Sequence, residues 1–270
     1  MRSRPTVNPF LRLLFVLAWS AAAVPVCAAA QGIPPRPELP RGADANDWEA
    51  YFDHGAAIFR SRPGQAHAAF YWATRLNPER AEPLFGQWAA FWMRDYGRWE
   101  QYLRDPERLR ERAEVVRADS LLHAAYGRNP FVHRGFEAVL YDQLPGRWRN
   151  DYRTRAWIAY ANGDFPKAVD FFGRAIRSNP KSPGIRFDRA CALTSAGRFA
   201  EALDEMTALV GALRERDATQ QLGAYESKAM LEHGIGLLHL ARRDSAQARE
   251  AFARALVDDL GFAPAHAALA

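Results

Sequence analysis

The sequence predicts an all-α protein, a right-handed solenoid of helix-turn-helix units with one irregular insertion. Three observations predict it. First, residues 150–183 have the pattern of two helices joined by the turn Asn162-Gly163-Asp164, where glycine permits a short reversal. Second, two small residues flank one large apolar residue on a single face of the second helix, and this spacing recurs along the chain. Third, small residues also recur twelve positions earlier, where the two helices of a unit would cross.

The second-helix pattern begins with Ala168, Phe172 and Ala175, and Pro180 then ends the helix. Four further copies keep its intervals wholly or in part: Ala66, Phe70, Ala73 and Pro78; Ala118, Leu122, Ala125 and Pro130; Ala202 and Met206; Ala248, Phe252 and Ala255. The small residues of the first helices are Ala156, Ala190 and Gly236. The pattern resembles the tetratricopeptide repeat (TPR), a helix-turn-helix unit of about 34 residues. This resemblance covers most of residues 47–270 and implies a fold, but not a particular ligand.

Residues 1–30 have the pattern of a secretory signal peptide. Arginines precede a short apolar run, and Ala28-Ala29-Ala30 offers the small residues of a cleavage site that would leave Gln31 first. The run is shorter than the roughly 20 apolar residues of a membrane span. Lipoprotein signals resemble one another in a small residue before the cysteine, whereas Val26 precedes Cys27, so a lipoprotein or a signal-anchored form is less favoured. We expect an exported protein, periplasmic or extracellular, that meets a membrane only if this segment is retained.

Charge and cysteine content further narrow the class of protein that this chain can be. Loss of the three arginines of the signal would lower the formal charge of +5 to +2, and the remaining arginines form no stripe, which argues against nucleic-acid binding. Cys191 would then be the last cysteine, so no internal disulfide is expected. We predict it to be a small buried or groove-lining residue.

The first elements follow in order. Residues 31–46 are rich in proline and are predicted to form an extended spacer. Asn46 or Asp47 can then cap a helix over residues 47–60. A helix with a large apolar residue at almost every turn is expected over residues 82–96.

The irregular part spans residues 98–149. A long helix is predicted over residues 106–127, and its charged first half is either a solvated face or a docking surface particular to this protein. Residues 131–149 resemble a half-repeat whose partner helix is reduced or missing. At the C-terminus, a short helix with Pro264 near its start would cover the last repeat, as solenoids require for solubility.

Solenoids of this kind bind partners on the concave face formed by their first helices. The resemblance to TPR proteins places the following residues there as a partner-binding groove: Trp48, Tyr51, Phe85, Trp92, Asn150, Arg153, Trp157, Tyr160 and Phe187. Each aromatic ring can bury roughly 150–250 Å², so four or more exposed together would exceed the apolar surface of an ordinary monomer. If these rings do face the groove, something should cover them. The alternative is that the rings pack between helices.

The predicted function is a non-catalytic protein-binding scaffold of the cell envelope, with no cofactor and no metal. The histidines show no HExxH pair, and the chain has neither a Gly-rich phosphate loop nor a Gly-x-Ser-x-Gly turn. One alternative is a small-ligand or glycan-binding module that uses the same rings. Others are an enzyme whose residues converge only in the fold, and self-association through the arm at residues 31–46. The sequence does not set the oligomeric state.

Overall fold

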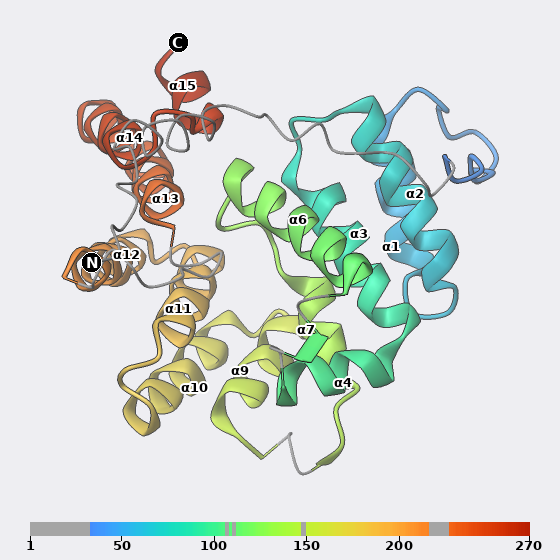
Figure 1. Cartoon of the computed structure of the whole chain (residues 1–270), viewed down its shortest axis with the longest axis horizontal. Coiled ribbons are helices and arrows are strands. Elements are labelled where there is room, and N and C mark those ends of the chain that lie inside the picture. The colour runs from blue at the N-terminus through green and yellow to red at the C-terminus, as the bar shows by residue number, and fades with distance from the viewer. Residues whose placement is uncertain (1–32, 106–107, 110–111, 147–149, 216–226) are drawn as a thin grey trace, which may run out of the picture. The chain divides into compact units, whose positions relative to one another are not determined.

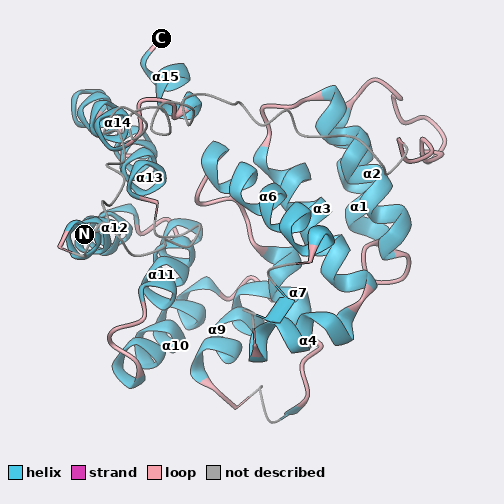
Figure 2. Cartoon of the chain, in the orientation of Figure 1, coloured by secondary structure: helices cyan, strands magenta, loops and turns pink. Residues whose placement is uncertain are grey.

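The regular structure of this protein is helical throughout the part of the chain that is described. The computed structural model describes residues 33–105, 108–109, 112–146, 150–215 and 227–270. Figures 1 and 2 show its helices and the loops between them. In these residues the helices number thirteen: α1 (Trp48–Ile58), α2 (Pro63–Leu76), α3 (Ala81–Arg94), α4 (Tyr96–Arg104), α6 (Ala113–Arg128), α7 (Gly135–Asp142), α9 (Tyr152–Ala161), α10 (Phe165–Ser178), α11 (Pro183–Ser195), α12 (Phe199–Arg214), α13 (Lys228–Ala241), α14 (Ser245–Asp258) and α15 (Ala263–Leu269).

Helices that follow one another in the chain pack against one another. Within residues 36–270, contacts run from α1 to α2 to α3, from α3 to α6, and then without interruption from α9 to α15. In Figure 1, α9, α11 and α13 lie on the side nearer α6 and α7, and α10, α12 and α14 lie on the outer side. This sequential pairwise packing is that of a TPR-like solenoid, so the predicted fold class is confirmed.

The turns of the last three hairpins explain how each chain reversal is made. Gly163 and Gly197 have φ angles of 75° and 72°, in the left-handed region that glycine enters without a steric cost. Arg243 stands at the equivalent place between α13 and α14 and has a φ of 61°. The side chains of Asp164 and Asp244 then accept hydrogen bonds from backbone N–H groups in the first turn of the following helix, which caps it.

The small residues of the first helices lie where the helices cross, as predicted. A Cβ added at Gly236 would lie 2.2 Å from the ring of Phe252, and one added at either Gly55 or Gly86 would lie 2.8 Å from the ring of Phe70. Ala156 and Ala190 are fully buried at the corresponding places. Phe70 and Phe252 of two second helices therefore fill the space that glycines leave on neighbouring first helices.

The insertion differs from its prediction. The prediction of a single helix over residues 106–127 is wrong. The helix α6 begins only at Ala113, because Arg112 before it has an extended conformation (φ −76°, ψ 125°). A separate helix, α4, precedes it, and α6 packs against α3 as the second helix of that unit. Leu109, which lies between α4 and α6 in the sequence, is buried in the hydrophobic core. Residues 106–107 and 110–111 of the charged half lie outside the described residues, so its role as a docking surface stays a prediction.

The predicted half-repeat corresponds to α7, a helix of eight residues that packs against α9 and α3. Its Phe136 lies among three rings of the first two hairpin helices, 4.8 Å from the Phe59 centroid and 5.1 Å from that of Phe70. Residues 147–149 of the expected partner helix lie outside the described residues. At the C-terminus, α15 packs on α14 through the buried Ala265, as predicted for a closing helix.

The N-terminal predictions are tested only in part. The signal at residues 1–30 lies outside the described residues. Residues 33–46 form no helix, but Arg36 turns back to donate to the Tyr51 hydroxyl at 2.7 Å and stacks over Trp72. The expected spacer therefore contacts α1 and α2 through Arg36. None of the described helices combines the length and apolarity needed to cross a bilayer.

Candidate functional site

Six of the nine residues predicted to line a groove are buried. Tyr51, Phe85, Trp92, Trp157, Tyr160 and Phe187 are each at most 2% exposed. The prediction that these rings line an open groove is therefore wrong, because other side chains cover all of them. Trp48 is half-buried, Asn150 is exposed, and the Arg153 side chain is 37% exposed. The glycan-binding alternative, which needed the same rings on the surface, loses its support for the same reason.

The six rings fall into two groups. In the N-terminal group, Phe85 stacks on Trp88 with centroids 5.3 Å apart, and Trp92 lies 5.5 Å from Trp99 of α4. The first contact lies within α3 and the second joins α3 to α4, as in an ordinary core. Trp48 lies outside this group and is covered by the guanidinium of Arg80 at 4.8 Å.

The second group lies on α9 and α11 and is covered by a distant part of the chain. We call residues 126–134 the docked segment: they comprise the last turn of α6 and the connector to α7. We call the surface of α9, α11 and α13 that contacts them the inner face. These rings are buried against the chain itself, for example Trp157 between Tyr141 of α7 and Phe172 of α10, which is the alternative of packing between helices.

The docked segment crosses the inner face from α13 through α11 to α9. At α13, the carbonyl oxygen of Arg128 lies 3.4 Å from His233 Nε2, and a Cβ added at Gly234 would lie 3.0 Å from Pro130. At α11, the thiol of Cys191 donates to the Pro130 carbonyl at 3.7 Å. The Tyr126 ring lies 5.5 Å from that of Phe187.

At α9 the end of the docked segment contacts Tyr160. The Tyr160 hydroxyl accepts a hydrogen bond from the Arg134 backbone N–H at 3.4 Å and contacts Ser195 Oγ at 2.9 Å. The ring of His133 lies 5.1 Å from the Tyr160 ring. Three helices of the inner face therefore contact main-chain groups of one segment, which is the end of α6 and the turn that follows it.

The side chain of Arg134 fills the deepest part of this contact. Its guanidinium lies 4.2 Å over the Trp157 ring, with the rings of Tyr126 and Phe187 on further sides. Its Nη1 donates to Asp188 of α11 at 2.7 Å, and it also pairs with Glu137 of α7. Flat stacking with carboxylates at the edges suits the planar fork of arginine.

Asp188 joins this buried pair to the surface. Its second oxygen accepts a hydrogen bond from Arg153 Nε at 2.7 Å. Four charged groups thus meet here, and solvent reaches only one of them to a large extent, namely Arg153. The other three, Arg134, Glu137 and Asp188, are buried. Arg153 is one of the residues predicted to line the groove, and its side chain is 37% exposed at the edge of this buried contact. It anchors Asp188 within the chain, and its role toward a partner stays a prediction.

Burial sets the protonation of the groups around this contact. It disfavours the charged guanidinium of Arg134, but Glu137, Tyr126 and Asp188 outweigh it and hold the pKa of Arg134 well above its ordinary value. Burial also raises the pKa of Glu137, against the opposing effect of Arg134. The pKa of the Cys191 thiol is raised to about 12 by burial, so this cysteine is a neutral, covered group as predicted.

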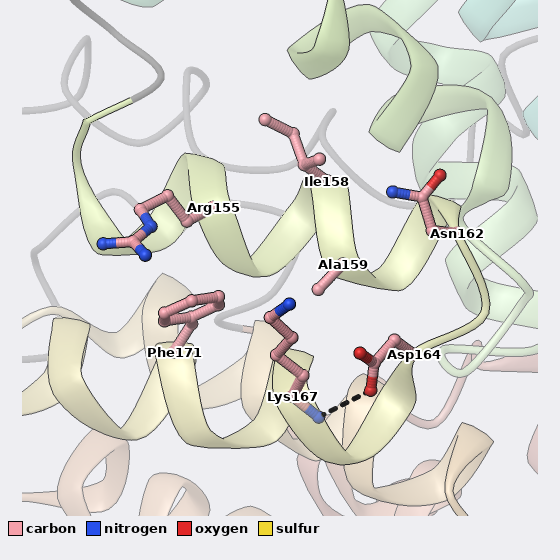
Figure 3. A pocket seen from close by; sticks show the side chains of 7 residues that line it. All are labelled: Arg155, Ile158, Ala159, Asn162, Asp164, Lys167 and Phe171. Atoms are coloured by element: carbon pink, nitrogen blue, oxygen red, sulfur yellow. Dashed lines mark hydrogen bonds between the residues drawn. The ribbon is translucent and has the colours of Figure 1, made fainter.

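A shallow hollow of about 220 Å³ lies on a different face of the α9–α10 hairpin (Figure 3). Its floor is apolar, and Arg155 stacks at 4.4 Å over the ring of Phe171 at one end. Figure 3 shows Asn162 at the other end and Lys167 between them. None of the predicted groove residues lines this hollow.

The residues that sequence reasoning missed are Arg134, Glu137 and Asp188. They stand outside the small–large–small pattern of the repeats, and the carboxylate of Asp188 lies 54 positions from its partner arginine. The nearest signal was Pro130, which ends a repeat copy and begins a connector too apolar for an exposed loop. No group of three or more metal-ligating side chains occurs in the described ranges.

No family model matches the sequence, and no curated protein matches it. The solved structures similar to it include YrrB, described as a TPR protein with an unusual peptide-binding site, at 15% identity over 83% of this chain and 93% of its own, with a TM-score of 0.36. A tetratricopeptide repeat protein of Parabacteroides merdae is 16% identical over 82% of each chain, with a TM-score of 0.35. MamA of Desulfovibrio magneticus is 11% identical over 81% of this chain and 97% of its own, with a TM-score of 0.33.

Proposed function

We propose that this protein is a non-catalytic scaffold that binds a short segment of another protein on the inner face of α9, α11 and α13. The observation that supports this proposal is that the inner face already holds one such segment, the end of α6 and the turn that follows it. His233, Cys191 and Tyr160 contact main-chain groups of the docked segment, which any sequence could offer. Contacts to the main chain supply affinity for a peptide, and side-chain pockets then supply the selectivity.

The docked segment competes with any partner for this face. Because it belongs to the same chain, its effective concentration is on the order of millimolar or higher. A partner segment must therefore displace it or meet the protein when it is released. Trp157, Tyr160 and Phe187 would contact the partner in the place of the docked segment, which gives these predicted groove residues a role consistent with their burial in the free chain.

The test uses the full chain with the inner face vacated. In the variant Phe131→Ser/Arg134→Ser, two anchors of the docked segment are removed, and binding of a labelled peptide of residues 126–136 is followed by fluorescence anisotropy. We expect the peptide to bind this variant and not the wild type.

The matched control adds Gly234→Leu to the same variant. A side chain at Gly234 would occupy the space where Pro130 and Phe131 lie, so the peptide should no longer bind. Circular dichroism verifies that both variants keep their helices. Equal binding to the blocked and the vacated variants, or no binding to a folded vacated variant, would contradict the proposal.

We also propose that the chain is exported, on the strength of the charged, apolar and small-residue pattern of residues 1–30. The mass of the protein recovered from the exported fraction of its host should correspond to a chain beginning at Gln31. Recovery of the full-length chain from the cytoplasm alone would contradict this proposal.

A further inference from the structure

The chemistry of the docked segment indicates which partner the inner face would accept, provided that the proposed function holds. We propose that the inner face is a receptor for an arginine side chain, and that its partner is a protein segment whose arginine takes the place of Arg134. A proline and an aromatic residue, three to four positions before that arginine, would occupy the places of Pro130 and Phe131.

The pocket around Arg134 fits a guanidinium better than an ammonium. One face of the guanidinium lies 4.2 Å over Trp157, while Asp188 and Glu137 receive N–H groups on two of its edges. A lysine carries a compact charge with no flat face and no fixed fork, so it could not satisfy the stacking contact and both carboxylates together.

The empty pocket would carry an unbalanced negative charge. With Arg134 in place, two guanidinium groups face two carboxylates. Without it, Arg153 would be the one guanidinium left beside Glu137 and Asp188 among the described residues, and both carboxylates are almost fully buried. Burial of an unpaired charge is costly, so the vacated pocket favours a cationic occupant.

The position of Glu137 does not depend on the docked segment alone. It lies on α7, which packs against α3 and α9 and is held by Phe136 among the rings of α1 and α2. Asp188 is held from α9 by Arg153. Both carboxylates can therefore stay in place when Arg134 leaves.

An ion pair of this kind contributes more to selectivity than to stability. A buried pair can often be replaced by apolar side chains of similar volume with no loss of stability, and its best-attested role is to fix a register. Here it fixes which residue of a bound segment lies over Trp157. The spacing between this pocket and the close approach at Gly234 then sets the spacing of arginine and proline in the partner.

The first experiment replaces the side chain by a small molecule. The thermal midpoint of full-length Arg134→Ala is measured with ethylguanidinium or ethylammonium chloride at equal millimolar concentrations, far below the denaturing range. We expect ethylguanidinium to raise the midpoint saturably and ethylammonium to leave it unchanged. Neither salt should change the wild type, and Arg134→Ala/Asp188→Asn should lose the response. If Arg134→Ala does not fold in buffer, recovery of its helical signal on refolding in ethylguanidinium alone is the same result.

The second experiment separates this inference from the proposed function. The vacated variant is titrated with two peptides of residues 126–136, one with arginine and one with lysine at position 134. We expect the arginine peptide to bind about tenfold tighter or more. Equal affinities, or equal effects of the two salts, would overturn the arginine receptor and leave the proposed function standing. Binding of neither peptide would overturn the proposed function, even if ethylguanidinium stabilised Arg134→Ala.

Discussion

At the scale of single residues, Asp188 links the docked segment to the inner face. It is 2% exposed and pairs with Arg134 of the docked segment through one oxygen and with Arg153 through the other. A neutral amide in its place would leave two guanidinium groups beside the single carboxylate of Glu137. The docking of residues 126–134 is therefore expected to be weaker without this side chain.

We expect Asp188→Asn to lower the free energy of unfolding by about 3–5 kcal/mol, the usual cost of breaking a buried pair from one side. Urea unfolding followed by circular dichroism measures it. The matched control is Asp170→Asn, which removes an exposed pair with Arg174 at 3.0 Å and should cost about 0–1 kcal/mol. Similar losses for the two variants would mean that the buried network does not hold the docked segment.

His67 should make the protein sensitive to acid. Burial, with a smaller effect from Arg94, lowers its pKa from 6.5 to about 4. Because the folded state disfavours the proton, this stability is fully present above pH 6.5 and is lost as the pH falls through that value towards 4. At pH 5 the loss is about 2 kcal/mol relative to neutral pH. Urea titrations of the wild type and His67→Gln at both pH values measure it, and an equal loss in the two proteins would contradict this assignment.

At the scale of elements, the hairpin turns follow a rule with one exception. Gly163 and Gly197 occupy the left-handed position, whereas Arg243 holds it without the freedom of glycine. A left-handed residue with a Cβ costs roughly 1–2 kcal/mol. Arg243→Gly should therefore raise the thermal midpoint, by relief of about 1 kcal/mol of strain, while Gly163→Ala should lower it. A lower midpoint for Arg243→Gly would show that the arginine side chain contributes more than the strain costs.

The crossing of α13 and α14 leaves no space for a methyl group. Gly236→Ala would place a Cβ 2.2 Å from the Phe252 ring, so we expect it to cost about 1–3 kcal/mol by overpacking. Gly211→Ala in α12 is the matched control, because a Cβ there meets nothing within 4 Å and alanine favours a helix. Thermal unfolding should rank Gly236→Ala well below wild type and Gly211→Ala at or above it; the reverse order would refute the crossing geometry.

These elements could be predicted because their signals are local. The glycine turns and the small residues facing Phe70, Phe172 and Phe252 each lie within a window of about one repeat of 34 residues. The insertion was predicted less well, since the break before Ala113 depends on how α4 and Leu109 pack and leaves no periodic trace. Helix boundaries in such a stretch are set by tertiary contacts.

At the scale of the whole unit formed by residues 36–270, the docked segment changes what the repeats present to a partner. For Trp157, Tyr160 and Phe187 the sequence leaves two alternatives, a covered groove and packing between helices, and the structure shows them buried. The sequence could not identify the docked segment, because its contacts with the inner face span 23 to 105 positions and involve groups without a repeat pattern. The face that would bind a partner is therefore buried, and not accessible to solvent, in the free chain.

Cys191 reports directly whether the docked segment covers the inner face, since its thiol lies under the carbonyl of Pro130. In a Cys27→Ser background, the rate of its alkylation by iodoacetamide is measured under native conditions for three proteins: the parent, Arg134→Ala, and Gly55→Ala. The last is destabilised where Gly55 meets Phe70, and it changes no residue of the docked segment or of the inner face. We predict slow alkylation of the parent and of Gly55→Ala, and fast alkylation of Arg134→Ala at a comparable free energy of unfolding. If the rates of both variants follow their unfolding free energies alone, the segment is an inseparable part of the core, and the central claim that the inner face is a site holding a replaceable segment is wrong.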